Sequence, residues 1–157
     1  PRSKVLRLSD DTYGSTSVAA LGVAAHECGH AIQHNTGYIP LQIRGALVPI
    51  VNFGSSIAWI LIAVGLFFNS RSSILFLNLG ILAFSLAVIF QLVTLPVEFN
   101  ASGRAVHILG GSGMLYDDEV NATKKVLFAA ALTYVAGAIS SILQLLRIIM
   151  IANNRRR

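Results

Sequence analysis

The sequence predicts an all-α, polytopic membrane helix bundle, and three observations support this fold class. Of the 157 residues, 54% are hydrophobic and only 12% are charged, whereas a soluble domain carries about 25% charged residues. The mean hydropathy is +0.67. Three apolar runs are each long enough to cross a bilayer, which takes about 20 helical residues. These values disfavour a soluble globular domain and argue against a disordered chain.

The segment before the first apolar run is expected to carry one helix. Residues 4–8 are compatible with a short strand, which a polar turn would follow. The hydroxyl side chains of residues 15–17 are good N-caps. A helix is therefore expected over residues 18–35, ended by Gly37 and Pro40.

Three membrane spans are predicted, at residues 46–68, 74–95 and 126–151. The first two contain no charged residue, and the third contains only Arg147, whose long side chain can reach the bilayer interface. A short polar stretch at residues 69–73 joins the first two spans, which should therefore form an antiparallel hairpin. We expect one membrane-embedded domain over residues 1–157.

The segment between the second and third spans is expected to contain a further helix. Pro96 should break the membrane helix and start this next one, because proline suits the first helical turn. The new helix should end at Gly110 and Gly111. Asp117 or Asp118 is the expected cap of the last helix.

The hairpin places residues 1–44 and 96–125 on the same side of the membrane. All seven acidic residues and all four histidines fall within these two segments. The candidate chemistry is thereby confined to one face of the bilayer.

The strongest motif is H-E-x-x-H at His26-Glu27-Cys28-Gly29-His30, within the first predicted helix. Histidines at positions i and i+4 project from the same helix face in successive turns, so both can bind a single metal ion. Glu27 is rotated by about 100° from His26, which suits it to deprotonate a water activated by zinc. The pattern predicts His26 and His30 as zinc ligands and Glu27 as the catalytic base.

Zinc needs a third protein ligand, and the sequence offers more than one candidate. His34 lies about 12 Å along the helix from His26, too far to share one ion with it, so it should be exposed or support the site from outside. Glu98 follows Pro96 where the second span returns to the active face. We favour Glu98 as the third ligand, with a helix N-terminal carboxylate as its alternative role. His107 could stabilise an oxyanion, but it is expected to be a surface residue.

Three stretches of the chain form a recognisable pattern: VAAHECGHAIQH at residues 23–34, LPVEFNASGRA at residues 95–105 and AALTYVA at residues 130–136. In these stretches the chain resembles the YugP-like family of neutral zinc metallopeptidases of bacterial membranes. With the apolar spans, the resemblance covers nearly the whole chain. A more distant similarity connects the chain to HtpX-type and CaaX-prenyl membrane proteases, which pair H-E-x-x-H with a downstream glutamate on a helix.

The resemblance implies a zinc peptidase in which His26, His30 and Glu98 hold the metal and Glu27 is the base. One position departs from the pattern of the distant relatives. They carry an aspartate four residues after the glutamate ligand, where it orients a histidine, but this chain has Ser102 there. A serine hydroxyl is a weaker hydrogen-bond acceptor than a carboxylate.

Two further residues, Arg104 and Tyr134, match the family pattern. Two alternative roles are considered for each of them. Either side chain could stabilise negative charge that develops on a substrate. Arg104 could instead form a structural salt bridge, and Tyr134 could anchor the third span at the bilayer interface.

Together these features predict a membrane-bound zinc-dependent metalloendopeptidase. Its site segments, residues 15–36 and 96–110, would lie at one bilayer surface of the cell membrane and act on a peptide or membrane-protein substrate. Two alternatives stay open, an intramembrane zinc protease and a non-catalytic membrane scaffold with a structural zinc site.

The expected partner besides the substrate is the lipid bilayer and not nucleic acid. The net charge of +5 includes the three terminal arginines and is not spread over a soluble surface. Basic residues near the spans are equally numerous on the two faces, so the positive-inside rule gives no orientation. Only the similarity to the distant relatives favours a cytoplasmic active site.

Overall fold

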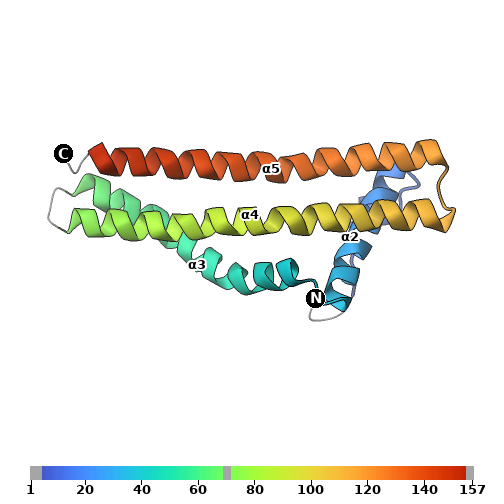
Figure 1. Cartoon of the computed structure of the whole chain (residues 1–157), viewed down its shortest axis with the longest axis horizontal. Helices are drawn as coiled ribbons and strands as arrows, with labels where there is room; N and C mark the ends of the chain where they lie inside the picture. Colours follow the sequence, from blue (N-terminus) through green and yellow to red (C-terminus); the bar gives the residue numbers. More distant parts are fainter. Residues whose placement is uncertain (1–4, 69–71, 155–157) are drawn as a thin grey trace. The chain divides into compact units, whose positions relative to one another are not determined.

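The computed structural model describes residues 5–68 and 72–154, and all regular elements in these ranges are helices (Figure 1). The helices, in chain order, are α1 (Asp10–Tyr13), α2 (Val18–Asn35), α3 (Ile39–Phe67), α4 (Ser73–Ser112) and α5 (Asp117–Asn154). The all-α prediction is confirmed over this part of the chain. The strand expected at residues 4–8 is not found in its described part, residues 5–8.

Three of the helices, α3, α4 and α5, are long and apolar enough to cross a membrane. Their most apolar windows have mean hydropathies of 2.0, 2.4 and 2.0, as expected from the three apolar runs. Each helix begins before or ends after the run that predicted it. Pro40 does not end α2 but lies in the first turn of α3, where a proline has no intrahelical hydrogen bond to lose. Most of the predicted linker, residues 69–71, lies outside the described residues.

The chain divides into two compact units. The first comprises Pro1–Gln42 with Thr94–Tyr134, and the second comprises Ile43–Val93 with Val135–Arg157. The first unit thus brings together the two segments that the sequence assigns to one side of the membrane. It contains all of the described histidine and acidic side chains.

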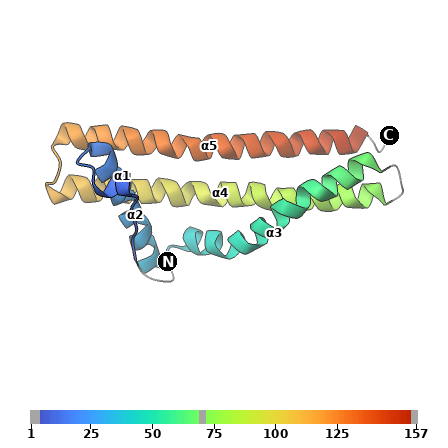
Figure 2. The ribbon, with the colours of Figure 1, turned by 180° about the vertical axis from the view of Figure 1, so that it is seen from behind.

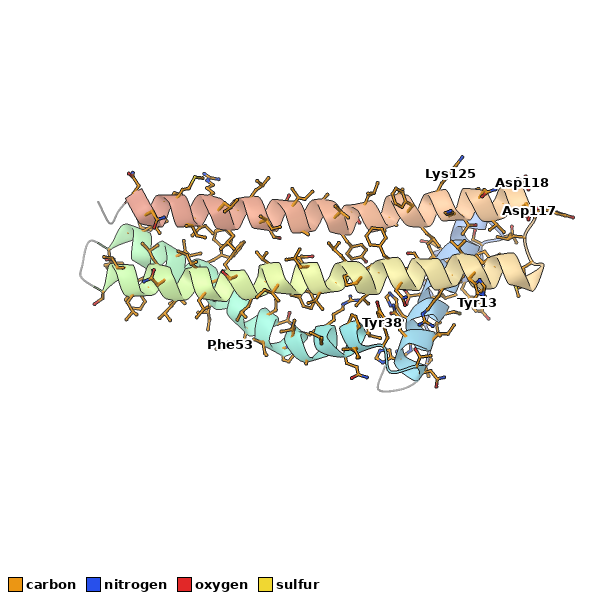
Figure 3. The ribbon with its side chains drawn as sticks, viewed as in Figure 1. Tyr13, Tyr38, Phe53, Asp117, Asp118 and Lys125 are labelled. Atoms are coloured by element: carbon orange, nitrogen blue, oxygen red, sulfur yellow. The ribbon has the colours of Figure 1, made fainter. Side chains whose placement is uncertain are left out.

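In the second unit, segments of α3, α4 and α5 pack through small and aliphatic side chains. A Cβ on Gly80 of α4 would lie 2.7 Å from Cγ1 of Ile62 on α3, so glycine allows these helices to approach closely. Phe53 is 71% exposed and points away from the other helices (Figure 3), as expected of a lipid-facing side chain. The buried core comprises Ala58, Ile62, Leu77, Phe84, Val88, Ile148 and Ala152.

In the first unit, α2 lies across α4 and the beginning of α5, as both ribbon views show (Figures 1 and 2). Two glycines make this crossing close. A Cβ on Gly29 would lie 2.5 Å from the carbonyl oxygen of Ala101 in α4, and one on Gly22 would lie 2.8 Å from Cγ2 of Thr123 in α5. The core around this crossing comprises Ala25, Ala105, Leu109 and Leu127.

The ends of α2 agree with the sequence prediction because both local signals act as expected. The hydroxyl of Ser17 accepts a hydrogen bond from the backbone N–H of Ala20. Gly37 adopts a φ of 63°, in the left-handed region that glycine occupies without strain. The cap expected on the last helix is wrong, since Asp117 is already its first residue and Glu119 accepts from the N–H of Tyr116 at 2.9 Å.

The break expected at Pro96 is also wrong, because α4 continues through this residue. Proline removes one N–H donor, but the other turns keep their hydrogen bonds, and long apolar helices tolerate such a gap. The hydroxyl of Tyr38 donates to the Pro96 carbonyl at 3.5 Å (Tyr38 is labelled in Figure 3). Gly110 and Gly111 lie inside α4, and the chain turns only at Gly113, whose φ is 68°.

Candidate metal centre

Three side chains in the first unit bring potential metal ligands together. They are His26 and His30 from α2 and Glu98 from α4, and their donor atoms all lie within 4.8 Å of one another. Nε2 of His26 is 3.2 Å and Nε2 of His30 is 3.6 Å from Oε2 of Glu98. The two imidazole rings meet edge to face with their centroids 4.7 Å apart. These are the three residues that the sequence predicts as ligands.

The two nitrogen–oxygen distances to Glu98 fit a zinc ion. Ligand atoms held about 2.1 Å from a tetrahedral zinc lie about 3.4 Å from one another, and the two nitrogen–oxygen distances of 3.2 and 3.6 Å lie on either side of this value. Two imidazoles and one carboxylate leave a fourth position open, as in catalytic zinc sites. Within residues 5–68 and 72–154, no second cluster of three or more such side chains is found.

The two helices converge on this point because each donor follows a buried contact residue. On α2, the residues before the two histidines are Ala25 and Gly29, both buried. On α4, Val97 precedes Glu98 and is fully buried. One further residue turns a helix by about 100°, so the donors of both helices emerge at the edge of the same helix contact.

Glu98 is a buried carboxylate with two imidazole partners. It is 2% exposed, and an unpaired charge at such a depth would be strongly destabilising. The Glu98 carboxylate beside His30 raises the pKa of that imidazole above the ordinary value of 6.5, although burial opposes the shift. Metal binding requires the neutral imidazole, so a metal ion at His30 competes with protonation of this ring.

Ser102 is the position that departs from the distant relatives, and its side chain contacts His26. Its Oγ lies 3.1 Å from Nδ1 of His26, while Nε2 of the same ring faces Glu98. Serine therefore stands where an outer partner of a ligating histidine is expected.

Two residues that the sequence interpretation missed, Gln33 and Asn100, support the other histidine. Gln33 is fully buried, and its Oε1 lies 2.9 Å from Nδ1 of His30. Its Nε2 donates to the Val97 carbonyl at 2.8 Å and to Oδ1 of Asn100 at 3.0 Å. Nε of Arg104 donates to the same Oδ1 at 2.9 Å. The only sequence signal for Gln33 is its place one helical turn after His30 on the histidine-bearing helix.

The other candidate residues lie outside the donor cluster. Glu27 is exposed on α2 beside the cluster, and its charge acts on His30. His34 is exposed, as expected for a histidine that cannot share the ion. His107 is exposed and lines an open cavity of about 470 Å³ together with Arg104. Tyr134 is exposed on α5.

In its described part the chain is helical, with three helices apolar enough to cross a membrane and a cluster of two histidines and one glutamate. These features define the class of helical membrane proteins with a candidate metal site. Comparisons with known proteins identify the family. The sequence matches the family described as "Putative neutral zinc metallopeptidase" over residues 1–153. The chain belongs to this family, which confirms the resemblance seen in its motifs.

A curated relative is similar over almost the same length. The chain is 48% identical over 156 residues to "Putative membrane protease YugP" of Bacillus subtilis (strain 168), an alignment that covers 99% of this chain and 68% of the relative. No solved structure matches the chain.

Proposed function

We propose that this protein is a membrane-bound, zinc-dependent metalloendopeptidase. The observation that carries the proposal is the convergence of His26, His30 and Glu98, whose donor atoms lie within 4.8 Å of one another. The names of the family and of the curated relative support zinc and a membrane protease.

The proposed roles follow from the chemistry of each side chain. His26, His30 and Glu98 hold the ion. Zinc, when bound, supplies a polarised substrate carbonyl and a water that loses its proton near neutral pH. Glu27 takes that proton and passes it to the leaving amine. Its exposed carboxylate lies next in sequence to His26 but outside the ligand cluster, so it is available for proton transfer.

The protein is proposed to be a multi-pass protein of the cell membrane that crosses the bilayer with α3, α4 and α5. The apolar windows of these helices support the three crossings. With α3 and α4 crossing in opposite directions, α2 and the end of α4 lie on one side, which we propose to be cytoplasmic by analogy with the distant relatives. Peptides or membrane-protein segments presented at that surface are the proposed substrates.

The proposal is tested by measuring zinc content and peptide cleavage on the purified full chain in lipid nanodiscs. Glu27→Gln should keep the zinc and lose turnover, because an amide cannot accept the proton. Glu98→Ala should lose both zinc and turnover. Asp118→Asn, which removes one exposed carboxylate at the start of α5, serves as the matched control and should change neither quantity.

Three results would contradict the proposal. A wild-type protein that contains no zinc would refute the ligand assignment. An active Glu27→Gln variant would refute the assignment of Glu27 as the base. Wild-type protein that carries zinc but cleaves no peptide or membrane protein would favour the scaffold alternative. Cleavage sites inside a substrate's membrane span, and not beside it, would favour the intramembrane alternative.

A further inference from the structure

We propose that Gln33, Asn100 and Arg104 form a hydrogen-bond relay that fixes which ring nitrogen of His30 is available to the metal. The inference rests on the proposed zinc site and names three positioning residues that act through His30. Each step of the relay is determined by a group that can only donate or only accept a hydrogen bond.

The first step is set by Arg104, because a guanidinium has donors and no acceptor. Its Nε lies 2.9 Å from Oδ1 of Asn100, so that atom must be the amide oxygen. Oδ1 of Asn100 consequently accepts from Arg104 and presents an acceptor to its other neighbour, Gln33.

The second step is set by two acceptors around Gln33. One end of its amide faces the backbone carbonyl of Val97 at 2.8 Å and Oδ1 of Asn100 at 3.0 Å. Both neighbours accept, so this end must be the NH₂ group. A flipped amide would set its oxygen against two acceptors in a fully buried place, which leaves polar groups unpaired.

The third step assigns the proton on His30. The remaining end of Gln33 is the oxygen Oε1, which lies 2.9 Å from Nδ1 of His30. An acceptor at this distance requires an N–H on Nδ1. In the neutral ring the lone pair is then on Nε2, the nitrogen that faces Glu98 at 3.6 Å.

Among the described residues, no such relay is found at the second histidine, His26. Nδ1 of His26 meets the hydroxyl of Ser102 at 3.1 Å, and a hydroxyl can donate or accept. Ser102 therefore leaves the tautomer of His26 open, whereas the amides fix that of His30. The hydrogen-bond partners therefore fix the tautomer of one proposed histidine ligand and not that of the other.

The consequence is a metal site that is preorganised at His30. Loss of an outer partner of a ligating histidine typically weakens metal binding by 10- to 100-fold. Gln33→Met should therefore weaken zinc binding by about 10- to 100-fold, because it keeps the side-chain length and removes all three hydrogen bonds. The measurement is chelator competition on the full chain in lipid nanodiscs.

The tautomer itself gives a second readout that does not depend on activity. In zinc-loaded wild-type protein, ¹⁵N spectra of His30 should show the proton on Nδ1 and the metal on Nε2. In Gln33→Met this single assignment should be lost. Thr123→Val is the matched control, since Thr123 is equally buried in the same unit and its hydroxyl donates to the carbonyl of Glu119. It should keep wild-type affinity and spectra.

A pair of variants at Asn100 tests the direction of the relay even where Gln33→Met fails to fold. Asn100→Asp offers only acceptors, as the relay requires at this position, and should keep zinc affinity close to wild type. Asn100→Leu should weaken it. Equal losses in both variants, or wild-type affinity and tautomer in folded Gln33→Met, would overturn the relay. A wild-type protein that binds no zinc would instead refute the proposed function.

Discussion

The Ser102 hydroxyl is a neutral hydrogen-bond partner of a histidine in the candidate metal centre. It meets Nδ1 of His26 at 3.1 Å, at the position where the distant relatives of the family carry an aspartate. A carboxylate would accept a charge-assisted hydrogen bond from the ring, which is about twice as strong as one between neutral groups. The affinity of this centre for zinc should therefore be tunable at one residue in both directions.

Ser102→Asp is expected to bind zinc more tightly than wild type, and Ser102→Ala about 10-fold more weakly, because the first strengthens and the second removes the outer partner of His26. Chelator competition on the purified variants measures both. Equal affinities in the three proteins would show that the hydrogen bond to Ser102 contributes nothing to the site.

The sequence is sufficient to predict that His26, His30 and Glu98 come together, because their positions follow simple rules. The histidines keep the four-residue spacing of a helix face, and the hairpin topology returns Glu98 to the same side. Gln33 and Asn100 follow no such rule. An amide in a helix has no spacing signal of its own, and these two meet only because α2 crosses α4 in space.

The close crossing of α2 and α4 is the element on which the centre depends. A Cβ at Gly29 would lie 2.5 Å from the carbonyl oxygen of Ala101 and 3.1 Å from its Cα, so the backbone itself occupies the space. Any larger residue must separate the helices that carry the histidines and Glu98. Helix packing and metal geometry are therefore coupled at one glycine.

Gly29→Ala is expected to destabilise the protein by about 1–3 kcal/mol through overpacking and to lower zinc affinity, because it moves two ligands away from the third. Denaturation in detergent and metal titration measure the two effects. Gly103→Ala is the matched control, since a Cβ there meets nothing within 4 Å. It should be neutral or stabilising by up to about 1 kcal/mol. Wild-type zinc affinity in Gly29→Ala would contradict the coupling.

The helix boundaries show which local sequence signals end a helix and which are outweighed by helix packing. Ser17 and Gly37 set the ends of α2 as predicted, since one caps the first turn and the other takes a positive φ. Pro96 and the glycines at positions 110 and 111 were expected to end helices but lie inside α4. Their local preference costs a few kcal/mol or less, which the packing of a long helix can outweigh.

At the scale of the whole molecule, composition and three apolar runs were enough to predict an all-helical membrane chain. The hairpin between α3 and α4 makes a further prediction, that Cys28 and Ser72 lie on opposite sides of the bilayer. Both positions are exposed, and Cys28 is the single cysteine of the chain, so membrane-impermeant thiol labelling can report each side separately.

In intact cells, Cys28 should stay unlabelled until the membrane is permeabilised, because the proposed site faces the cytoplasm. A Ser72→Cys variant that also carries Cys28→Ser should be labelled without permeabilisation. Labelling of both cysteines from the same side would contradict the three crossings. Labelling of Cys28 alone from outside would keep the crossings and reverse the proposed orientation.

The central claim is that two histidines and a glutamate of this chain hold zinc, and X-ray absorption at the zinc edge tests it most directly. The purified full chain should contain one zinc with nitrogen and oxygen ligands at about 2.0–2.1 Å, including two imidazoles, and Glu98→Ala should lose the ion or change this shell. A chain without zinc, or a sulfur ligand at about 2.3 Å from Cys28, would contradict the account.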